Sequence, residues 1–94
     1  MDKSEATKIL QWHISRYRAK PYAELVRLIG NAQVHVTTSV SGTKYTLEFD
    51  VLRDSDSDGD IRVIGEIDDG TFPSSFWPLC DDFILSPDGK FVGE

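Results

Sequence analysis

The sequence has little of what secreted or membrane-spanning proteins use. Its single cysteine, Cys80, leaves no internal disulfide, which is typical of proteins from a reducing compartment. No apolar run approaches the roughly 20 residues that a membrane-spanning helix needs. Residues 1 to 5 carry charges at once instead of the apolar stretch of a secretory signal. We therefore expect a cytoplasmic protein that does not act on membranes.

Basic residues are also scarce, and they are unevenly distributed. The chain has 10 Lys and Arg against 16 Asp and Glu, a net charge of −6. Residues 1 to 30 hold six basic and three acidic residues, whereas residues 31 to 94 hold four and thirteen. The acidic part would repel phosphate backbones, and the cations of the first part spread around the whole circumference of a helix. We expect no binding to nucleic acid.

The first third of the chain has the 3.6-residue periodicity of helices. Ninety-four residues provide one hydrophobic core, so we expect a single domain, 1-94. Residues 3 to 19 predict one helix and residues 21 to 29 a second. Their apolar stripes would point roughly 140° apart on one continuous helix, so the chain should break or kink before Pro21. The first stripe surrounds His13 and consists of Ala6, Ile9, Leu10, Ile14 and Tyr17.

From residue 33 onward the period changes to two, which predicts strands. The first strand should bury Val34, Val36, Thr38 and Val40 and turn outward Gln33, His35, Thr37 and Ser39. Further strands are predicted at residues 45 to 51, 61 to 67 and 82 to 85, with a short last one at Phe91-Val92. The predicted fold class is α+β: two N-terminal helices, or one kinked helix, packed on one face of an antiparallel β-meander of four to five strands.

Two segments of the second half carry a resemblance. Ile67-Asp68-Asp69-Gly70 and the terminal DFILSPDGKFVGE, residues 82 to 94, are similar to the end of a family of short, uncharacterised bacterial proteins. The likeness extends from Tyr45 onward. It implies a compact bacterial domain, and it transfers no activity, cofactor or functional residue, because that family has none assigned.

Residues 54 to 60, Asp-Ser-Asp-Ser-Asp-Gly-Asp, resemble a calcium-binding loop. Such loops use Asp at positions 1, 3 and 5, Gly at 6 and a bidentate Glu at 12, but position 12 here is Gly65. One hypothesis is a weak calcium site formed by Asp54, Asp56, Asp58 and Asp60. The other is a solvated acidic hairpin tip, since Asp and Ser satisfy turn backbones.

Candidate catalytic groups are few. His13 lies on an apolar helical stripe, where a core histidine is the usual outcome, and His35 has outward parity on its strand. Cys80 precedes Asp81-Asp82, which would raise a thiol pKa rather than activate it. A dyad of Cys80 with His35 stays open, because distance in sequence says nothing about space. Without a nucleophile elbow, phosphate loop or metalloprotease motif, we predict no enzyme and no cofactor other than the alternative calcium.

The remaining function class is a protein-interaction domain. Phe72, Phe76 and Trp77 lie in a connection rich in Pro and Ser; they could anchor a protein interface or cap an open end of the sheet. An acidic protein that covers a basic surface of its partner also fits the charge. We predict a small non-catalytic domain that works through protein contacts, as a monomer or a weak homodimer paired through an edge strand.

Overall fold

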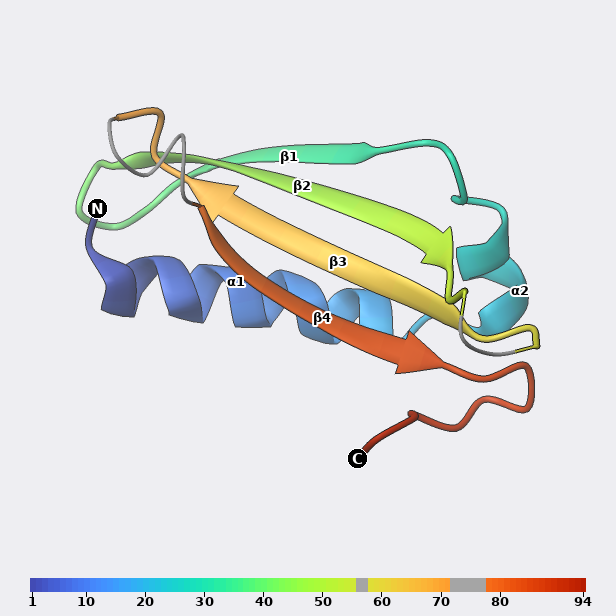
Figure 1. Cartoon of the computed structure of the whole chain (residues 1–94). Helices are drawn as coiled ribbons and strands as arrows, with labels where there is room; N and C mark the ends of the chain where they lie inside the picture. Colours follow the sequence, from blue (N-terminus) through green and yellow to red (C-terminus); the bar gives the residue numbers. More distant parts are fainter. Residues whose placement is uncertain (56–57, 72–77) are drawn as a thin grey trace.

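The computed structural model has a helical N-terminal part followed by a β-meander (Figure 1). The structure describes residues 1–55, 58–71 and 78–94. The predicted α+β class and antiparallel sheet are confirmed. In chain order the elements are α1 (Lys3–Arg18), α2 (Tyr22–Val26), β1 (Gln33–Thr38), β2 (Lys44–Arg53), β3 (Ile61–Asp68) and β4 (Leu79–Leu85).

The two helices are separated where the sequence predicts a break. The side chain of Asp2 caps α1 by accepting a hydrogen bond of 3.0 Å from the backbone N–H of Glu5. Pro21 then precedes α2, which is shorter than predicted. The helix ends at Val26, and Ile29 then forms an isolated parallel bridge to Val51 of β2. Within the described residues, no helix is both long and apolar enough to cross a membrane.

The sheet has the order β1-β2-β3-β4, and every neighbouring pair is antiparallel. Alternate residues of the two central strands are buried, as their two-residue period predicts. Phe91, predicted in a last short strand, joins Leu85 through an isolated antiparallel bridge. The buried positions of β2 and β3 are Tyr45, Leu47, Phe49, Val51, Ile61, Val63, Gly65 and Ile67.

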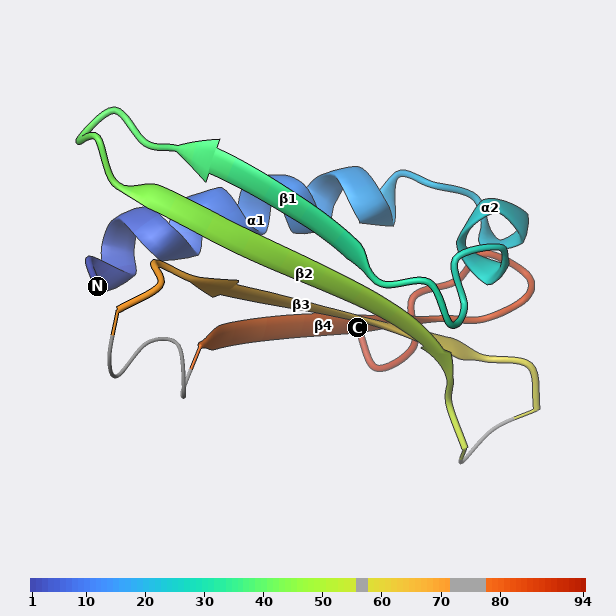
Figure 2. The same cartoon turned by 90° about the horizontal axis from the view of Figure 1, so that it is seen from above.

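Helix α1 contacts the sheet along its length, as the views in Figures 1 and 2 agree. Near its beginning, the hydroxyl of Tyr45 donates a hydrogen bond of 2.9 Å to Glu5 Oε1. Burial and this carboxylate raise the pKa of Tyr45 to about 12. Near its end, the ring of Tyr17 stacks on that of Phe49, with centroids 4.3 Å apart. The buried side chains of α1 join those of the strands in one hydrophobic cluster; they are Ala6, Leu10, Ile14 and Tyr17.

Strand β1 has the opposite parity to the one predicted. Its Val34 and Val36 are 60% and 58% exposed, and the polar residues between them are half-buried. The register pairs His35 with the buried Leu47, and His35 Nε2 lies 2.8 Å from the Tyr17 hydroxyl. The prediction that the valines point inward and His35 outward is therefore wrong, because the histidine supplies a polar partner that a valine cannot.

Gly65, which occupies the last position of the calcium pattern, leaves space for a ring. It lies opposite Phe49 in the β2–β3 register. A Cβ at residue 65 would overlap the Phe49 ring, with Cζ only 2.9 Å away. A carboxylate ligand would not fit here, so the departure from the calcium pattern at this position has a packing cause.

We predict that Gly65→Ala lowers the free energy of unfolding by about 1 to 3 kcal/mol, because overpacking a filled core forces its neighbours to move. Denaturant unfolding measures the change. In a Phe49→Leu background the same substitution should have a smaller effect, since the shorter side chain vacates that space. Equal losses in both backgrounds would contradict the contact.

Candidate functional site

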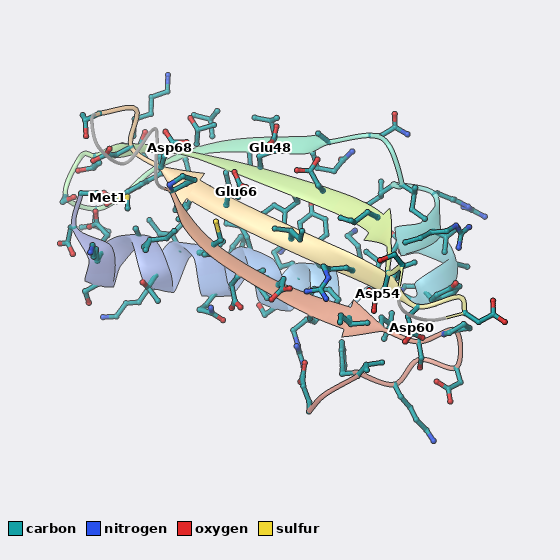
Figure 3. All side chains as sticks on the ribbon, in the orientation of Figure 1. Met1, Glu48, Asp54, Asp60, Glu66 and Asp68 are labelled. Carbon is teal, nitrogen blue, oxygen red and sulfur yellow. The ribbon has the colours of Figure 1, made fainter. Side chains whose placement is uncertain are left out.

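The acidic loop joins β2 to β3 at one end of the sheet (Figure 3). The backbone N–H of Asp54 donates a hydrogen bond of 2.9 Å to the carbonyl of Asp60, and Asp58 is exposed. Asp56 lies outside the described residues. Among the residues that are described, no three His, Cys, Asp or Glu side chains are grouped closely enough to hold a metal ion. The calcium site of Asp54, Asp56, Asp58 and Asp60 stays a prediction.

The aromatic connection predicted to bind a partner precedes β4. Phe72, Phe76 and Trp77 all lie outside the described residues, so their role in an interface also stays a prediction. The chain is described up to Thr71 and again from Pro78.

The structure separates Cys80 from His35. These residues belong to β4 and β1, the two edges of the sheet, which corresponds to about 14 Å at the usual spacing between strands. Partial burial and the nearby Glu66 carboxylate raise the pKa of the Cys80 thiol. With His35 out of reach and a thiolate disfavoured, this pair cannot act as a nucleophilic dyad in the observed arrangement.

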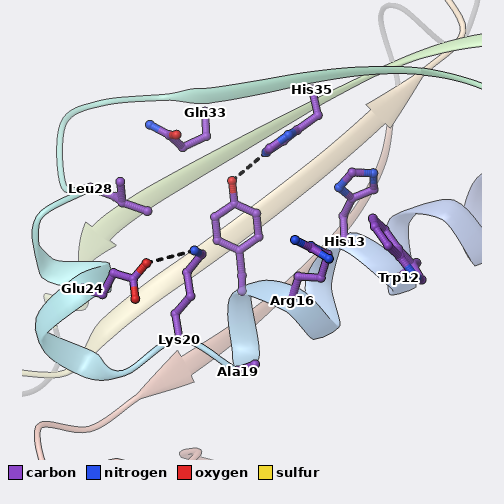
Figure 4. Close-up of a pocket in the computed structure, with 10 residues that line it drawn as sticks. Trp12, His13, Arg16, Ala19, Lys20, Glu24, Leu28, Gln33 and His35 are labelled. Carbon is purple, nitrogen blue, oxygen red and sulfur yellow. Dashed lines mark hydrogen bonds and ion pairs between the residues drawn. The ribbon is translucent and has the colours of Figure 1, made fainter.

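His35 instead contributes to a groove between α1, α2 and β1. The groove has a volume of about 650 Å³. Side chains from α1 and from β1 reach toward each other across it (Figure 4). We call it the α1–β1 groove; it is lined by Trp12, His13, Arg16, Tyr17, Ala19, Lys20, Glu24, Leu28, Gln33 and His35.

The polar groups of the α1–β1 groove are closely spaced. The rings of His13 and His35 have centroids 5.1 Å apart. Burial lowers the pKa of His13, and the charges of His35 and Arg16 lower it further. The Arg16 guanidinium lies 4.9 Å from the centre of the Trp12 ring. The sequence groups Trp12 and Arg16 on one basic aromatic helix, and their four-residue spacing aligns them along it. It gives no sign that His13 and His35 lie next to them.

A second surface follows from the alternation of the strands. The register places Glu48 directly opposite Glu66 and aligns Val34 with Glu48. Figure 3 shows Glu48, Glu66 and Asp68 near one another on the sheet. Asp82 forms an ion pair with Arg62, which with Lys44 is one of two basic residues on this side of the sheet. We call this surface the acidic face; it comprises Val34, Val36, Thr38, Lys44, Thr46, Glu48, Asp50, Leu52, Arg62, Ile64, Glu66, Asp68, Cys80, Asp82 and Ile84.

Sequence reasoning recorded these acids as the outward positions of separate strands and missed their alignment. The alternation of Glu48 and Asp50, and of Glu66 and Asp68, was visible in the sequence. Their juxtaposition depends on the β2–β3 register, which periodicity alone does not supply.

Comparison with known proteins adds no assignment. No family model, no curated protein and no solved structure matches this chain.

We predict that stability falls between about pH 7.5 and 5.5 because of His13. Its pKa in the folded protein is below the ordinary value of 6.5, so the unfolded chain binds the proton more readily and stability declines as pH decreases through that range. The carboxylates with lowered pKa act at lower pH, because Glu5 and Glu94 start from 4.5 and Asp88 from 3.8.

Thermal unfolding of the wild type and of His13→Gln at both pH values measures this effect. The variant should show a smaller pH dependence, whatever its midpoint at pH 7.5. An unchanged dependence would mean that the imidazole of His13 titrates alike in the folded and unfolded chain.

Proposed function

We propose that this protein is a non-catalytic interaction domain that binds a basic protein surface against its acidic face. In this arrangement α1 covers one face of the sheet and leaves the acidic face open to a partner. Antiparallel sheets commonly have one packed and one solvated face. The partner's Lys and Arg side chains would pair with the acidic residues, which outnumber Lys44 and Arg62 on this face.

The pairing of Glu48 with Glu66 is the observation that carries this proposal. Like charges directly opposite each other on neighbouring strands destabilise a sheet. Asp50 and Asp68 extend the charge along the same strands, two residues from the pair. A partner with Lys or Arg at these positions would convert the repulsion into attraction, so the free domain gives up stability that the complex recovers.

Exposed apolar side chains adjoin these carboxylates. Val34 and Val36 on β1 are more than half exposed, and Leu52 on β2 is 40% exposed. Interfaces combine apolar contact area with charged groups that fix orientation and partner choice. The aliphatic stems of Lys and Arg would cover such valines while their charged ends reach the acids. The mixture favours a protein partner over a small cation.

The charge of the acidic face also disfavours pairing between two copies of this chain through this surface. Two acidic faces would bring like charges together, and like-charge juxtaposition opposes association. We therefore expect the free protein to be a monomer at low ionic strength, and the complex to contain a different chain.

The first test uses a defined probe, an eight-residue peptide of alternating Lys and Val. NMR titration of the full chain should shift the amide signals of β2 and β3, and the binding should weaken with salt. The variant Glu48→Gln/Glu66→Gln should bind more weakly than the matched control Asp58→Asn/Asp88→Asn, which removes the same charge elsewhere. Equal weakening in both variants, or shifts confined to the helices, would contradict the proposal.

The same pair of variants tests the charge argument without any partner. Glu48→Gln/Glu66→Gln should raise the free energy of unfolding by about 0.2 to 1 kcal/mol, because a like-charge cross-strand pair disappears. The gain should shrink as salt screens the charges. A loss of stability at low salt, measured by denaturant unfolding, would show that the two carboxylates do not repel each other.

A further inference from the structure

We infer that the α1–β1 groove binds a small aromatic anion, an aryl phosphate or aryl carboxylate, with its flat ring on Trp12 and its charged group between Arg16 and the two histidines. This site is separate from the acidic face and extends the protein's function beyond binding a basic partner.

The groove has the dimensions of a ligand site. Its volume of about 650 Å³ falls within the roughly 300 to 1,000 Å³ of known small-molecule pockets. It lies where three elements meet, α1, α2 and β1 (Figure 4). A single aromatic ring with one charged substituent is small enough to enter a hollow of this size.

The charge of the groove is opposite to that of the chain as a whole. Two cations, Arg16 and Lys20, line it against one acid, Glu24, whose carboxylate lies 3.0 Å from Lys20 Nζ. Arg16 is exposed, and its guanidinium offers several donors in a plane that fits a carboxylate or phosphate. In a protein of net charge −6, a local excess of positive charge selects anions at this one place.

An aromatic surface adjoins this cation. Trp12 is 57% exposed although aromatic side chains of its size are usually largely buried. The His13 ring meets it edge to face, with centroids 4.9 Å apart. The guanidinium of Arg16 lies over the Trp12 ring in the free protein, so a ligand ring that stacks on the indole would displace the guanidinium from that face and leave it free to pair with the charged substituent of the ligand.

The parity of β1 supplies the polar side of the groove. The strand turns Gln33 and His35 toward α1 and leaves its valines exposed. A strand that contradicts its own hydrophobic pattern is a place to expect function. The Tyr17 hydroxyl holds the His35 ring through its 2.8 Å hydrogen bond, so this imidazole is oriented before any ligand arrives.

Phenyl phosphate is the probe, titrated into the full chain and followed by NMR and calorimetry, with inorganic phosphate and phenol as separate arms. Phenyl phosphate should bind saturably, with a Kd of roughly millimolar or tighter for so small a ligand, and shift amide signals of α1 and β1. Inorganic phosphate and phenol should each bind at least about tenfold more weakly, since each lacks one half of the recognition. Equal binding of inorganic phosphate, or no saturable binding, would overturn the inference.

Matched variants locate the site. Arg16→Gln should weaken phenyl phosphate binding about tenfold. Lys44→Gln, which removes an exposed cation at the start of β2, should leave it unchanged. Both positions are exposed, so both variants should keep the wild-type thermal midpoint. Equal affinities of the two variants would refute the groove as the site.

The acidic-face variant Glu48→Gln/Glu66→Gln separates this inference from the proposed function. It should retain phenyl phosphate binding while losing affinity for the basic peptide. Loss of both activities together in a variant that remains folded would contradict the assignment of two independent sites.

Discussion

The contacts of Tyr17 with β2 and β1 decide which side chains of β1 face the helix and which face outward. Its ring stacks on Phe49, and its hydroxyl shares a hydrogen bond with His35. A buried hydroxyl without a partner costs about 1 to 3 kcal/mol, so a valine in place of the histidine would leave this tyrosine unsatisfied. Because strand side chains alternate, bringing His35 to the helix sends Val34 and Val36 outward. The α1–β1 groove and the apolar edge of the acidic face are two results of this single choice.

Those parts of the fold that local rules determine were predictable from the sequence. Three features follow from the spacing of residues along one segment: the apolar stripe of α1 that ends at Tyr17, the break before Pro21 and the alternating burial of β2. The parity of β1 was not predictable in this way. Its valines alternate with polar residues, so hydrophobicity alone predicts that the valines are buried. The hydrogen bond between His35 and Tyr17, which lies 18 positions earlier in the chain, favours the opposite orientation of the strand.

The candidate sites needed a register and a neighbour that no single segment specifies. Glu48 and Glu66 looked like ordinary outward residues until the pairing of β2 with β3 placed them opposite each other. Trp12 and Arg16 lie on the same side of α1, but they line a groove only because the polar side of β1 faces them. The hypothesis of a Cys80–His35 dyad failed for the same reason, since strand order alone puts the two at opposite edges.

The most direct test of this account is the side of β1 that faces the helix, measured by NOE contacts in solution. The account predicts NOEs between the ring protons of Tyr17 and His35, together with strong broadening of the Val34 and Val36 methyl signals by a soluble paramagnetic probe. NOEs from the Val34 or Val36 methyls to the Tyr17 ring, with the His35 ring broadened instead, would reverse the parity of the strand and contradict the account.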